Sequence, residues 1–369
     1  MAASPTRRSL PGSGLELLQV RAAGGRARLD PVFERACVDY RVAVASDVEA
    51  LHLRAAPFVS GDRLSIDGVP TRPLLWHRKT LLPGHNLALI EVRHPGVDAP
   101  AMCRVHIRRH DETALTERFL SRDHVDAERG LRMPYRLFVP ERRDAATPRP
   151  LVVYLNGGDT TGDDNETQLW GSRGATVWAE PAEQAVRPAF VLAPQSRPPS
   201  GTSRGEPPGG FGLTRNAAGE RCMDHVLEPT VDLQLALQIV AQVLAEYPDI
   251  DRRRVYITGV SQGGFGTWSA AILQPTWFAA AVPIAGGGDP RRVSTLVDLP
   301  VWAFHAQDDP VIPVHYTSRC IDALRLAGGR PRFTRYPRGT FFDPQEHCCW
   351  VDAYARDAMR AWLFAQARA

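Results

Sequence analysis

The stretch that decides the fold of this chain reads Val255-Tyr256-Ile257-Thr258-Gly259-Val260-Ser261-Gln262-Gly263-Gly264. A run of β-branched and apolar residues ends in Gly-x-Ser-x-Gly, and a helix-like segment follows at once. This pattern predicts a strand, a sharp turn and a helix that together lift the Ser261 hydroxyl clear of a sheet. The alternative is an ordinary turn, since Gly and Ser are common in turns. The motifs on either side of the stretch favour a catalytic serine.

The composition is that of an ordinary globular chain. A length of 369 residues with 44% hydrophobic residues predicts one large domain or two domains. The net charge is only +3, and the 44 basic residues, of which Lys79 is the only lysine, form no dense patch with interleaved aromatics. We therefore expect no nucleic-acid partner. No apolar run approaches the length of a membrane span, so we expect no membrane association either.

The N-terminal segment and the cysteines bear on the compartment. Residues 1–15 are expected to be flexible, and no apolar core follows Arg7 and Arg8, so no secretory signal is visible. The expectation is a cytoplasmic protein, although a trimmed secreted form would have the same sequence. The spacing of the six cysteines matches no metal or redox motif, which favours reduced packing residues. A bridge between Cys37 and Cys103 is the alternative.

Residues 16–110 predict an all-β domain. Period-2 alternation of apolar and polar residues, interrupted by turn residues, is typical of an antiparallel sandwich with one buried face per sheet. The histidines of this region form no ligand cluster, and core packing is the expected role of Phe58 and Trp76. A charged segment at residues 111–129 is expected to link this domain to the next. The alternating runs lie at residues 38–44, 50–54, 63–66, 87–92 and 103–107.

Four short pieces give this region a resemblance. They are Leu29-Asp30-Pro31-Val32-Phe33, Tyr40-Arg41-Val42, Ile66-Asp67-Gly68-Val69 and Leu82-Pro83-Gly84-His85-Asn86. In their order they resemble the cadherin-like, immunoglobulin-like β-sandwich found as an accessory domain in bacterial proteins. Such a domain could bind a polymer, mediate homo-oligomerisation or border a cleft.

Residues 130–369 follow a different pattern, in which strands and helices alternate. Strands are expected at residues 135–140, 150–155, 189–193, 255–260, 279–284, 301–305 and 332–336, and helices at residues 229–246, 263–273, 314–326 and 350–366. This alternation predicts a mostly parallel sheet with helices on both faces. Reactive groups in such a sheet gather at the C-terminal ends of its strands.

A serine hydroxyl needs a base to take its proton. In enzymes built on this elbow the chain order is serine, acid, histidine, so the base lies downstream of Ser261. His225 precedes the serine, His305 ends a strand too early in the chain, and His315 begins a helix. His347 follows the last predicted strand and precedes the final helix, so it is the predicted base.

The acid should follow the strand at residues 301–305. The loop there reads Ala306-Gln307-Asp308-Asp309-Pro310 and so offers two adjacent carboxylates. Asp309 is preferred because Pro310 fixes the turn after it, and Asp308 is the alternative. A carboxylate in this place would orient the imidazole and stabilise the imidazolium.

An oxyanion hole needs backbone N–H donors where negative charge develops. One predicted donor is the N–H of Gln262, the residue after the serine. The other is expected in the glycine-rich loop after the strand at residues 150–155, where Gly158 is preferred and Asp159 is next. Glycines in that loop let the backbone approach a substrate closely.

Further pieces of residues 130–366 complete a pattern: Tyr135-Arg136-Leu137, Leu155-Asn156-Gly157-Gly158, Gly162-Asp163-Asp164-Asn165, Trp178-Ala179-Glu180-Pro181, Phe190-Val191-Leu192-Ala193-Pro194-Gln195, Phe304-His305 with Asp309, and His347 with Trp350. With the elbow, they resemble the bacterial α/β-hydrolase esterases often labelled "predicted peptidase", close to polyhydroxybutyrate-depolymerase-like and feruloyl-esterase-like enzymes. The resemblance implies carboxylic ester hydrolysis by Ser261, Asp309 and His347, with no metal or organic cofactor. It departs at Asn156, where the family usually has a structural histidine.

The sequence therefore predicts a serine carboxylesterase that acts on a small or polymeric ester. A serine peptidase of the same fold is one alternative, and a polymer- or carbohydrate-binding protein with a vestigial hydrolase domain is another. The stretch at residues 194–228 is rich in Pro, Gly, Ser and Arg and is expected to shape the substrate pocket as a partial lid.

Overall fold

The computed structural model divides the chain into two compact units, one spanning residues 1–113 and the other residues 114–369. The structure describes residues 13–22, 27, 29, 31–45, 48–82, 84–97, 100–110, 113–141, 147–170, 172–198, 209–212, 214–215, 221–222, 229–341 and 345–368. The N-terminal segment expected to be flexible thus lies outside the described residues up to position 12.

The first unit contains two β-sheets that share one apolar core. A three-stranded sheet has the order β1-β3-β6, and a five-stranded sheet has the order β2-β8-β7-β4-β5. Leu53 of the smaller sheet and Val105 of the larger sheet, both fully buried, belong to the same apolar cluster. The strands are β1 (Leu15–Ala22), β2 (Asp39–Ala45), β3 (Ala50–Pro57), β4 (Arg63–Ile66), β5 (Val69–Thr71), β6 (His77–Thr80), β7 (Gly84–Arg93) and β8 (Ala101–His110).

The first unit differs from the sequence predictions in its strand pairing and in the exposure of Phe58. The pairing of β2 with β8 is parallel, so the sheets are not wholly antiparallel as predicted. Phe58 is 45% exposed, so a core role for it is wrong, and the half-buried ring of Trp76 lies under the guanidinium groups of Arg21 and Arg54. Phe58 directly follows β3 and Trp76 directly precedes β6, so neither residue lies within a strand.

The cysteines that the structure describes are free thiols, and they include the pair for which a bridge was the alternative. Cys103 is buried on β8, and Cys37 is half-buried just before β2. Burial raises the pKa of the Cys103 thiol to about 12. The side chain of Cys222 lies outside the described part of the chain.

The second unit is built on an eight-stranded sheet of order β18-β17-β16-β15-β11-β12-β10-β9. The six strands from β18 to β12 pair in parallel, and β10 and β9 complete the sheet in antiparallel pairing. The mostly parallel sheet expected from the sequence is therefore present. The strands are β9 (Phe119–Asp126), β10 (Leu131–Phe138), β11 (Arg149–Leu155), β12 (Phe190–Pro194), β15 (Ile250–Val260), β16 (Ala280–Ile284), β17 (Trp302–Ala306) and β18 (Arg332–Tyr336).

The segment predicted as a linker at residues 111–129 is instead mostly structured. It contains the short helix α1 (Thr113–Thr116) and strand β9, whose residues pair with β10 from Phe119 to Asp126. Because β9 is an edge strand, most of its side chains face water and are polar. Its sequence therefore has the composition of a loop, which is why the prediction was wrong.

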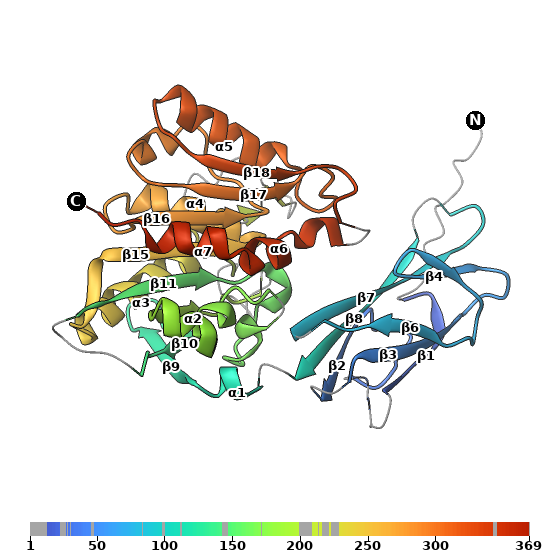
Figure 1. Ribbon diagram of the computed structural model, residues 1–369. Coiled ribbons are helices and arrows are strands. Elements are labelled where there is room, and N and C mark those ends of the chain that lie inside the picture. The colour runs from blue at the N-terminus through green and yellow to red at the C-terminus, as the bar shows by residue number, and fades with distance from the viewer. Residues whose placement is uncertain are drawn as a thin grey trace. The chain divides into compact units, whose positions relative to one another are not determined.

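Helices cover both faces of this sheet, as Figure 1 shows for α6 and α7 in front of it. One apolar cluster joins α3, α4 and α5 to one face, and a second joins the 3-10 turn η3 (Thr176–Ala179), α6 and α7 to the other. Consecutive residues of β11, such as Val152 and Val153, point into opposite clusters. The helices are α2 (Pro181–Val186), α3 (Val231–Glu246), α4 (Gln262–Leu273), α5 (His315–Leu326), α6 (Trp350–Ala355) and α7 (Asp357–Phe364).

The helix predicted at residues 350–366 is broken into α6 and α7. The backbone of Arg356 is extended, with φ −73° and ψ 107°, and its side chain donates to Asp352. Four further 3-10 turns connect elements of the sheet, namely η1 (Gly158–Thr160), η2 (Thr167–Leu169), η4 (Val293–Leu296) and η5 (Gln345–Cys348). In the described residues, no helix is both long and apolar enough to cross a membrane.

Most of the stretch predicted to act as a lid lies outside the described residues. Within residues 194–228 the structure describes the first five residues, 194–198, and three short pieces. Two of these pieces are the paired strands β13 (Thr214–Arg215) and β14 (Arg221–Cys222), and the third spans residues 209–212.

Candidate active site

Ser261 occupies the sharp turn between β15 and α4. Its backbone has φ 54° and ψ −117°, a left-handed conformation that non-glycine residues adopt only under strain. A Cβ atom on Gly263 would lie 2.0 Å from the carbonyl oxygen of Leu155, and one on Gly259 would lie 2.4 Å from the carbonyl oxygen of Gly263. The two glycines of the motif are therefore required by close backbone contact, as the sequence pattern predicts.

The hydroxyl of Ser261 begins a chain of two hydrogen bonds. Its Oγ lies 2.9 Å from Nε2 of His347, and Nδ1 of the same ring lies 2.7 Å from Oδ2 of Asp309. Three residues predicted from different parts of the sequence are thus brought together after β15, after β17 and after β18. A serine, a histidine and a carboxylate in this order can transfer the hydroxyl proton to the imidazole while the carboxylate holds the ring.

The carboxylate of Asp309 is fully buried and fully hydrogen-bonded. Its Oδ1 accepts the backbone N–H groups of Val311 and Ile312, both at 2.9 Å. Burial alone would raise the pKa of this carboxyl, but hydrogen bonds from His305 and His347 outweigh burial and hold the pKa well below its usual range. Asp309 is therefore an anion at neutral pH.

The other candidate acid, Asp308, points elsewhere. Its Oδ2 accepts the backbone N–H of Gly339 at 2.7 Å, in the turn after β18. The two neighbouring carboxylates thus have separate partners, and Asp309 is the one that contacts His347.

His347 lies in η5, immediately before α6. Its side chain is 12% exposed, and its ring meets the ring of Trp350 edge-on with centroids 5.1 Å apart. Trp350 is buried, so its ring packs against the imidazole from a fixed position. Of the other histidines weighed as a base, His315 is exposed at the start of α5, and His225 lies outside the described residues.

The two loops predicted to form an oxyanion hole adjoin each other. Gln262 begins α4, so its backbone N–H has no partner within that helix. Gly158 begins η1, and a Cβ atom built on it would lie 3.4 Å from the side-chain Oε1 of Gln262. A Cβ atom on the neighbouring Gly157 would lie 3.6 Å from the carbonyl oxygen of Val260, so this loop lies beside the turn that carries Ser261.

Asn156 ties the loop after β11 to the loop after β12. The fully buried Asn156 donates from Nδ2 to the carbonyl of Gly157 at 2.8 Å, and its Oδ1 accepts the N–H of Ser196 at 3.1 Å. The Ser196 hydroxyl oxygen also accepts a hydrogen bond from Nε2 of Gln262 at 3.3 Å. Asn156 thus holds the loop backbone. Ser196 was missed, and nothing in the sequence distinguishes it from other loop serines.

A buried ion pair anchors two described segments of the long loop, residues 194–198 and 209–212. The guanidinium of Arg197 donates to Oδ1 of Asp232 at 2.6 Å, and the two side chains are 3% and 0% exposed. The backbone N–H groups of Arg197 and Gly210 both donate to Oδ2 of Asp232. The first turn of α3 therefore holds two segments that lie next to Gln262, since a Cβ atom on Gly210 would lie 2.8 Å from its Nε2.

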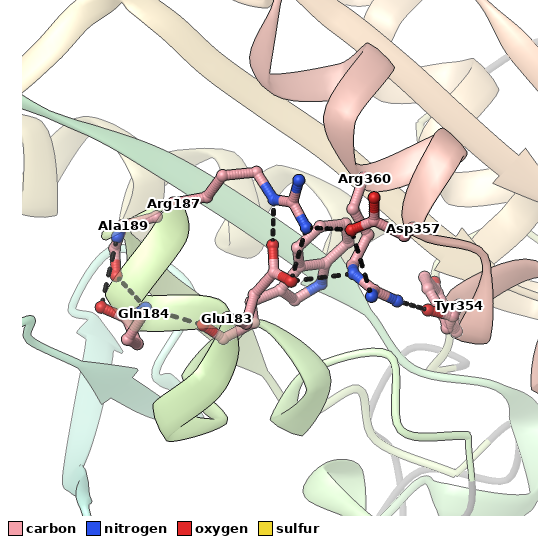
Figure 2. A network of polar contacts seen from close by, with 8 residues as sticks. Glu183, Gln184, Arg187, Ala189, Tyr354, Asp357 and Arg360 are labelled. Carbon is pink, nitrogen blue, oxygen red and sulfur yellow. Dashed lines mark hydrogen bonds and ion pairs between the residues drawn. The ribbon is translucent and has the colours of Figure 1, made fainter.

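A second buried charge cluster holds the C-terminal helices in place. Figure 2 shows the carboxylate of Glu183 on α2 between the guanidinium groups of Arg187 and Arg360. Arg360 on α7 also donates to the backbone carbonyl of Tyr354 on α6. Because η5 leads directly into α6, this cluster fixes the elements that follow His347.

Comparison with known proteins adds the family. No protein-family model matches the sequence, and no curated protein matches it either. A solved structure described as a thermostable esterase is 34% identical to this chain, with a TM-score of 0.61 and a match that covers 79% of this chain and 74% of that one. The chain belongs to the family of this esterase, the α/β-hydrolase-fold serine hydrolases.

Other α/β-hydrolases of known structure are less similar to it. A puromycin-hydrolysing peptidase of Mycobacterium tuberculosis is 16% identical with a TM-score of 0.48, over 76% of this chain and 46% of that one. An acylaminoacyl peptidase is 13% identical with a TM-score of 0.44, over 88% of this chain and 52% of that one. This α/β-hydrolase spans only about half of either peptidase, and its family membership depends on the likeness to the esterase.

Proposed function

We propose that this serine hydrolase is a carboxylesterase that works through an acyl-enzyme. The observation that supports the proposal most is the continuous hydrogen-bonded chain from Ser261 through His347 to Asp309. Its members follow three different strands of the sheet, and the serine sits on a strained turn stabilised by glycines. The likeness to an esterase at 34% identity supports ester substrates.

In the first half of the proposed reaction, Oγ of Ser261 attacks the ester carbonyl carbon. Nε2 of His347, 2.9 Å from Oγ in the free enzyme, takes the hydroxyl proton. The imidazolium then gives this proton to the departing alcohol oxygen, and the bond between that oxygen and the carbonyl carbon breaks. The acyl group remains on Ser261.

In the second half, a water molecule attacks the acyl carbon. His347 takes a proton from the water and returns it to Oγ of Ser261 as the acid is released. Asp309 keeps its negative charge throughout, because four N–H groups lie around its carboxylate and its pKa is held well below the usual range. It orients the ring and stabilises the imidazolium in both steps.

The negative charge that develops on the carbonyl oxygen needs donors fixed in advance. We assign this role to the backbone N–H groups of Gln262 and Gly158. The loop of Gly158 is supported by Asn156, whose amide bonds to Gly157 and Ser196. Asn156 therefore supports this loop at a position where the enzymes that the sequence resembles usually have a histidine.

The proposed activity is tested with a panel of esters and one fluorogenic peptide series. Short and long acyl p-nitrophenyl esters, a feruloyl ester, an acetylated sugar and a polyester cover the substrate classes. We expect ester turnover to exceed peptide turnover, and the opposite ranking would make the protein a peptidase.

The matched variants for this panel are Ser261→Ala and Ser269→Ala. Ser269 lies on α4, the helix that follows Ser261, and is buried, so its variant controls for the loss of a hydroxyl in this part of the fold. Ser261→Ala should abolish ester hydrolysis while Ser269→Ala retains it. Retained turnover in Ser261→Ala would remove the assignment.

We further propose that the first unit is an immunoglobulin-like accessory domain. Two sheets around one apolar core, with half-exposed aromatics such as Phe58, support this interpretation. Binding of the full chain to insoluble polyester or polysaccharide would give the unit a polymer-binding role. Binding together with an inactive Ser261 site would favour a binding protein over an enzyme.

A further inference from the structure

His305 is a second histidine on the aspartate of the proposed triad. It lies near the end of β17, four residues before Asp309, and its side chain is fully buried. Its place in the chain excludes it as the base, and the reaction steps above give it no role. The hydrogen-bond partners of its two ring nitrogens nevertheless determine which of these nitrogens carry a hydrogen.

Both ring nitrogens of His305 face oxygen atoms. Nε2 lies 2.8 Å from the backbone carbonyl oxygen of Ile312 and 3.1 Å from Oδ2 of Asp309. Nδ1 lies 2.7 Å from the hydroxyl oxygen of Thr317 on α5. The Thr317 hydroxyl in turn lies 2.5 Å from the backbone carbonyl oxygen of Gly286.

The donor inventory of these groups allows one consistent assignment. A carbonyl oxygen and a carboxylate only accept, so Nε2 must carry a hydrogen. The single hydrogen of Thr317 is directed at Gly286, so its oxygen accepts from Nδ1, which must carry a hydrogen as well. An imidazole with hydrogen on both nitrogens is a cation.

The buried cation has its counterion in contact. The carboxylate of Asp309 is 3.1 Å away, and both side chains are 0% exposed. A charge buried without a partner would be costly, whereas a pair with further hydrogen bonds on each member is a stable arrangement. Oδ2 of Asp309 therefore lies between two histidines, one buried and one beside Ser261.

We propose that His305 is a positioning residue, held as an imidazolium, that locks the Asp309 carboxylate in place and shares its negative charge with His347. This inference rests on the proposed function, because it concerns the same site. The fixed positive charge opposes the addition of a second proton at His347. Its consequence is an enzyme that stays active at lower pH than it would without His305.

The other groups around His305, in the described part of the chain, do not supply a fixed positive charge. The loop after β17 contributes Asp309, α5 contributes the neutral Thr317, and the segment after β16 contributes the backbone of Gly286. η5 contributes His347, across the carboxylate, and the residue just before α6 contributes the thiol of Cys349. Burial raises the pKa of that thiol well above its ordinary value, so it is uncharged.

The first test measures the protonation of His305 directly. Nitrogen NMR of the full chain labelled on histidine nitrogens, assigned with His305→Gln, should show hydrogen on both ring nitrogens between pH 6 and pH 8. The same result is expected in Ser261→Ala, which has no turnover under the proposed function. A neutral ring with one hydrogen in this range would overturn the proposal, whether or not the protein is an esterase.

The second test uses the pH profile of kcat/KM for p-nitrophenyl acetate. In His305→Gln we expect kcat to fall by about tenfold or more, because the carboxylate is less well placed. We also expect the acid limb to move up by about one pH unit, because a nearby positive charge is lost. His315→Gln, at an exposed histidine on α5, is the control and should change neither.

A loss of rate with an unmoved acid limb would contradict the shared charge and leave His305 a merely structural residue. If His305→Gln does not fold, Thr317→Val replaces it in the same profile, since this variant removes the acceptor for Nδ1, together with the hydrogen bond from Thr317 to Gly286. The acid limb should then move in the same direction. An unchanged profile in folded Thr317→Val would count against the proposal.

Discussion

Nδ1 of His347 lies 2.7 Å from Oδ2 of Asp309, although the two residues are 38 positions apart in the chain. The contact depends on two loops that leave the neighbouring parallel strands β17 and β18 at the same edge of the sheet. Asp308, one residue earlier, instead accepts the N–H of Gly339. The relationship therefore separates two carboxylates that are adjacent in sequence.

This separation predicts different effects of two matched substitutions. Asp309→Asn should lower kcat for p-nitrophenyl acetate by about 10³ to 10⁴, because an amide can hold the ring in the wrong tautomer. Asp308→Asn removes a carboxylate of the same loop and should leave kcat within a few-fold of wild type. Equal losses in the two variants would mean that the contact with His347 is not the catalytic one.

The elbow glycines give a prediction about stability. In Gly263→Ala the new Cβ would lie 2.0 Å from the carbonyl oxygen of Leu155, so β11 or α4 must shift and the melting temperature should fall sharply. In Gly158→Ala the Cβ would lie 3.4 Å from a side-chain oxygen of Gln262, and the melting temperature should change little. Thermal unfolding followed by circular dichroism measures both, and a stable Gly263→Ala would show that the turn is looser than described.

The sequence could predict the site because its residues are arranged by strand order. Ser261, Asp309 and His347 each follow a recognisable apolar strand, and parallel strands bring such positions to one edge. The role of His305 could not be read in this way, because its hydrogens are defined by Ile312, Thr317 and Gly286, which only the fold brings together. A histidine four residues before the acid is the one signal the chain offered.

The fold was predictable where strands are buried and not where they are exposed. β11 and β16 are continuous apolar runs and were found, whereas the polar edge strand β9 was read as a linker. The single helix expected at residues 350–366 breaks at Arg356. The backbone of Arg356 is extended, its side chain pairs with Asp352, and α7 begins at the next residue. Neither the polar edge strand β9 nor the break at Arg356 contains a Pro or Gly that would have indicated it in the sequence.

The charge cluster of Figure 2 predicts a stability loss on the side of the sheet that carries α7. Glu183 is buried and paired with Arg187 and Arg360, so Glu183→Gln leaves these two guanidinium groups with only the exposed Asp357 as counterion. We expect the free energy of unfolding to fall by about 3 kcal/mol in urea titrations. Asp357→Asn, at a 69% exposed carboxylate of the same cluster, is the control and should shift the midpoint little. Similar midpoints for both variants would show that burial does not decide the strength of this cluster.

The free thiols predict a pattern of chemical labelling. Cys37 and Cys348 are half-buried, whereas Cys103, Cys320 and Cys349 are buried, and burial raises the pKa of the Cys320 thiol to about 12. In the native protein at pH 8, a thiol reagent should modify the first two and spare the other three until the chain unfolds. Peptide mass spectrometry identifies the modified sites, and a Cys37–Cys103 bridge would appear as a peptide pair that reacts only after reduction.

The central claim is that Ser261 carries the acyl group during ester hydrolysis. The most direct measurement is rapid acid quench of the enzyme with p-nitrophenyl acetate, followed by peptide mass spectrometry. The account predicts an acetylated peptide with the modification on Ser261, an increased yield of it when deacylation is slow, and none in Ser261→Ala. Acetylation at another residue that turns over at the rate of hydrolysis, or hydrolysis that continues in Ser261→Ala, would contradict it.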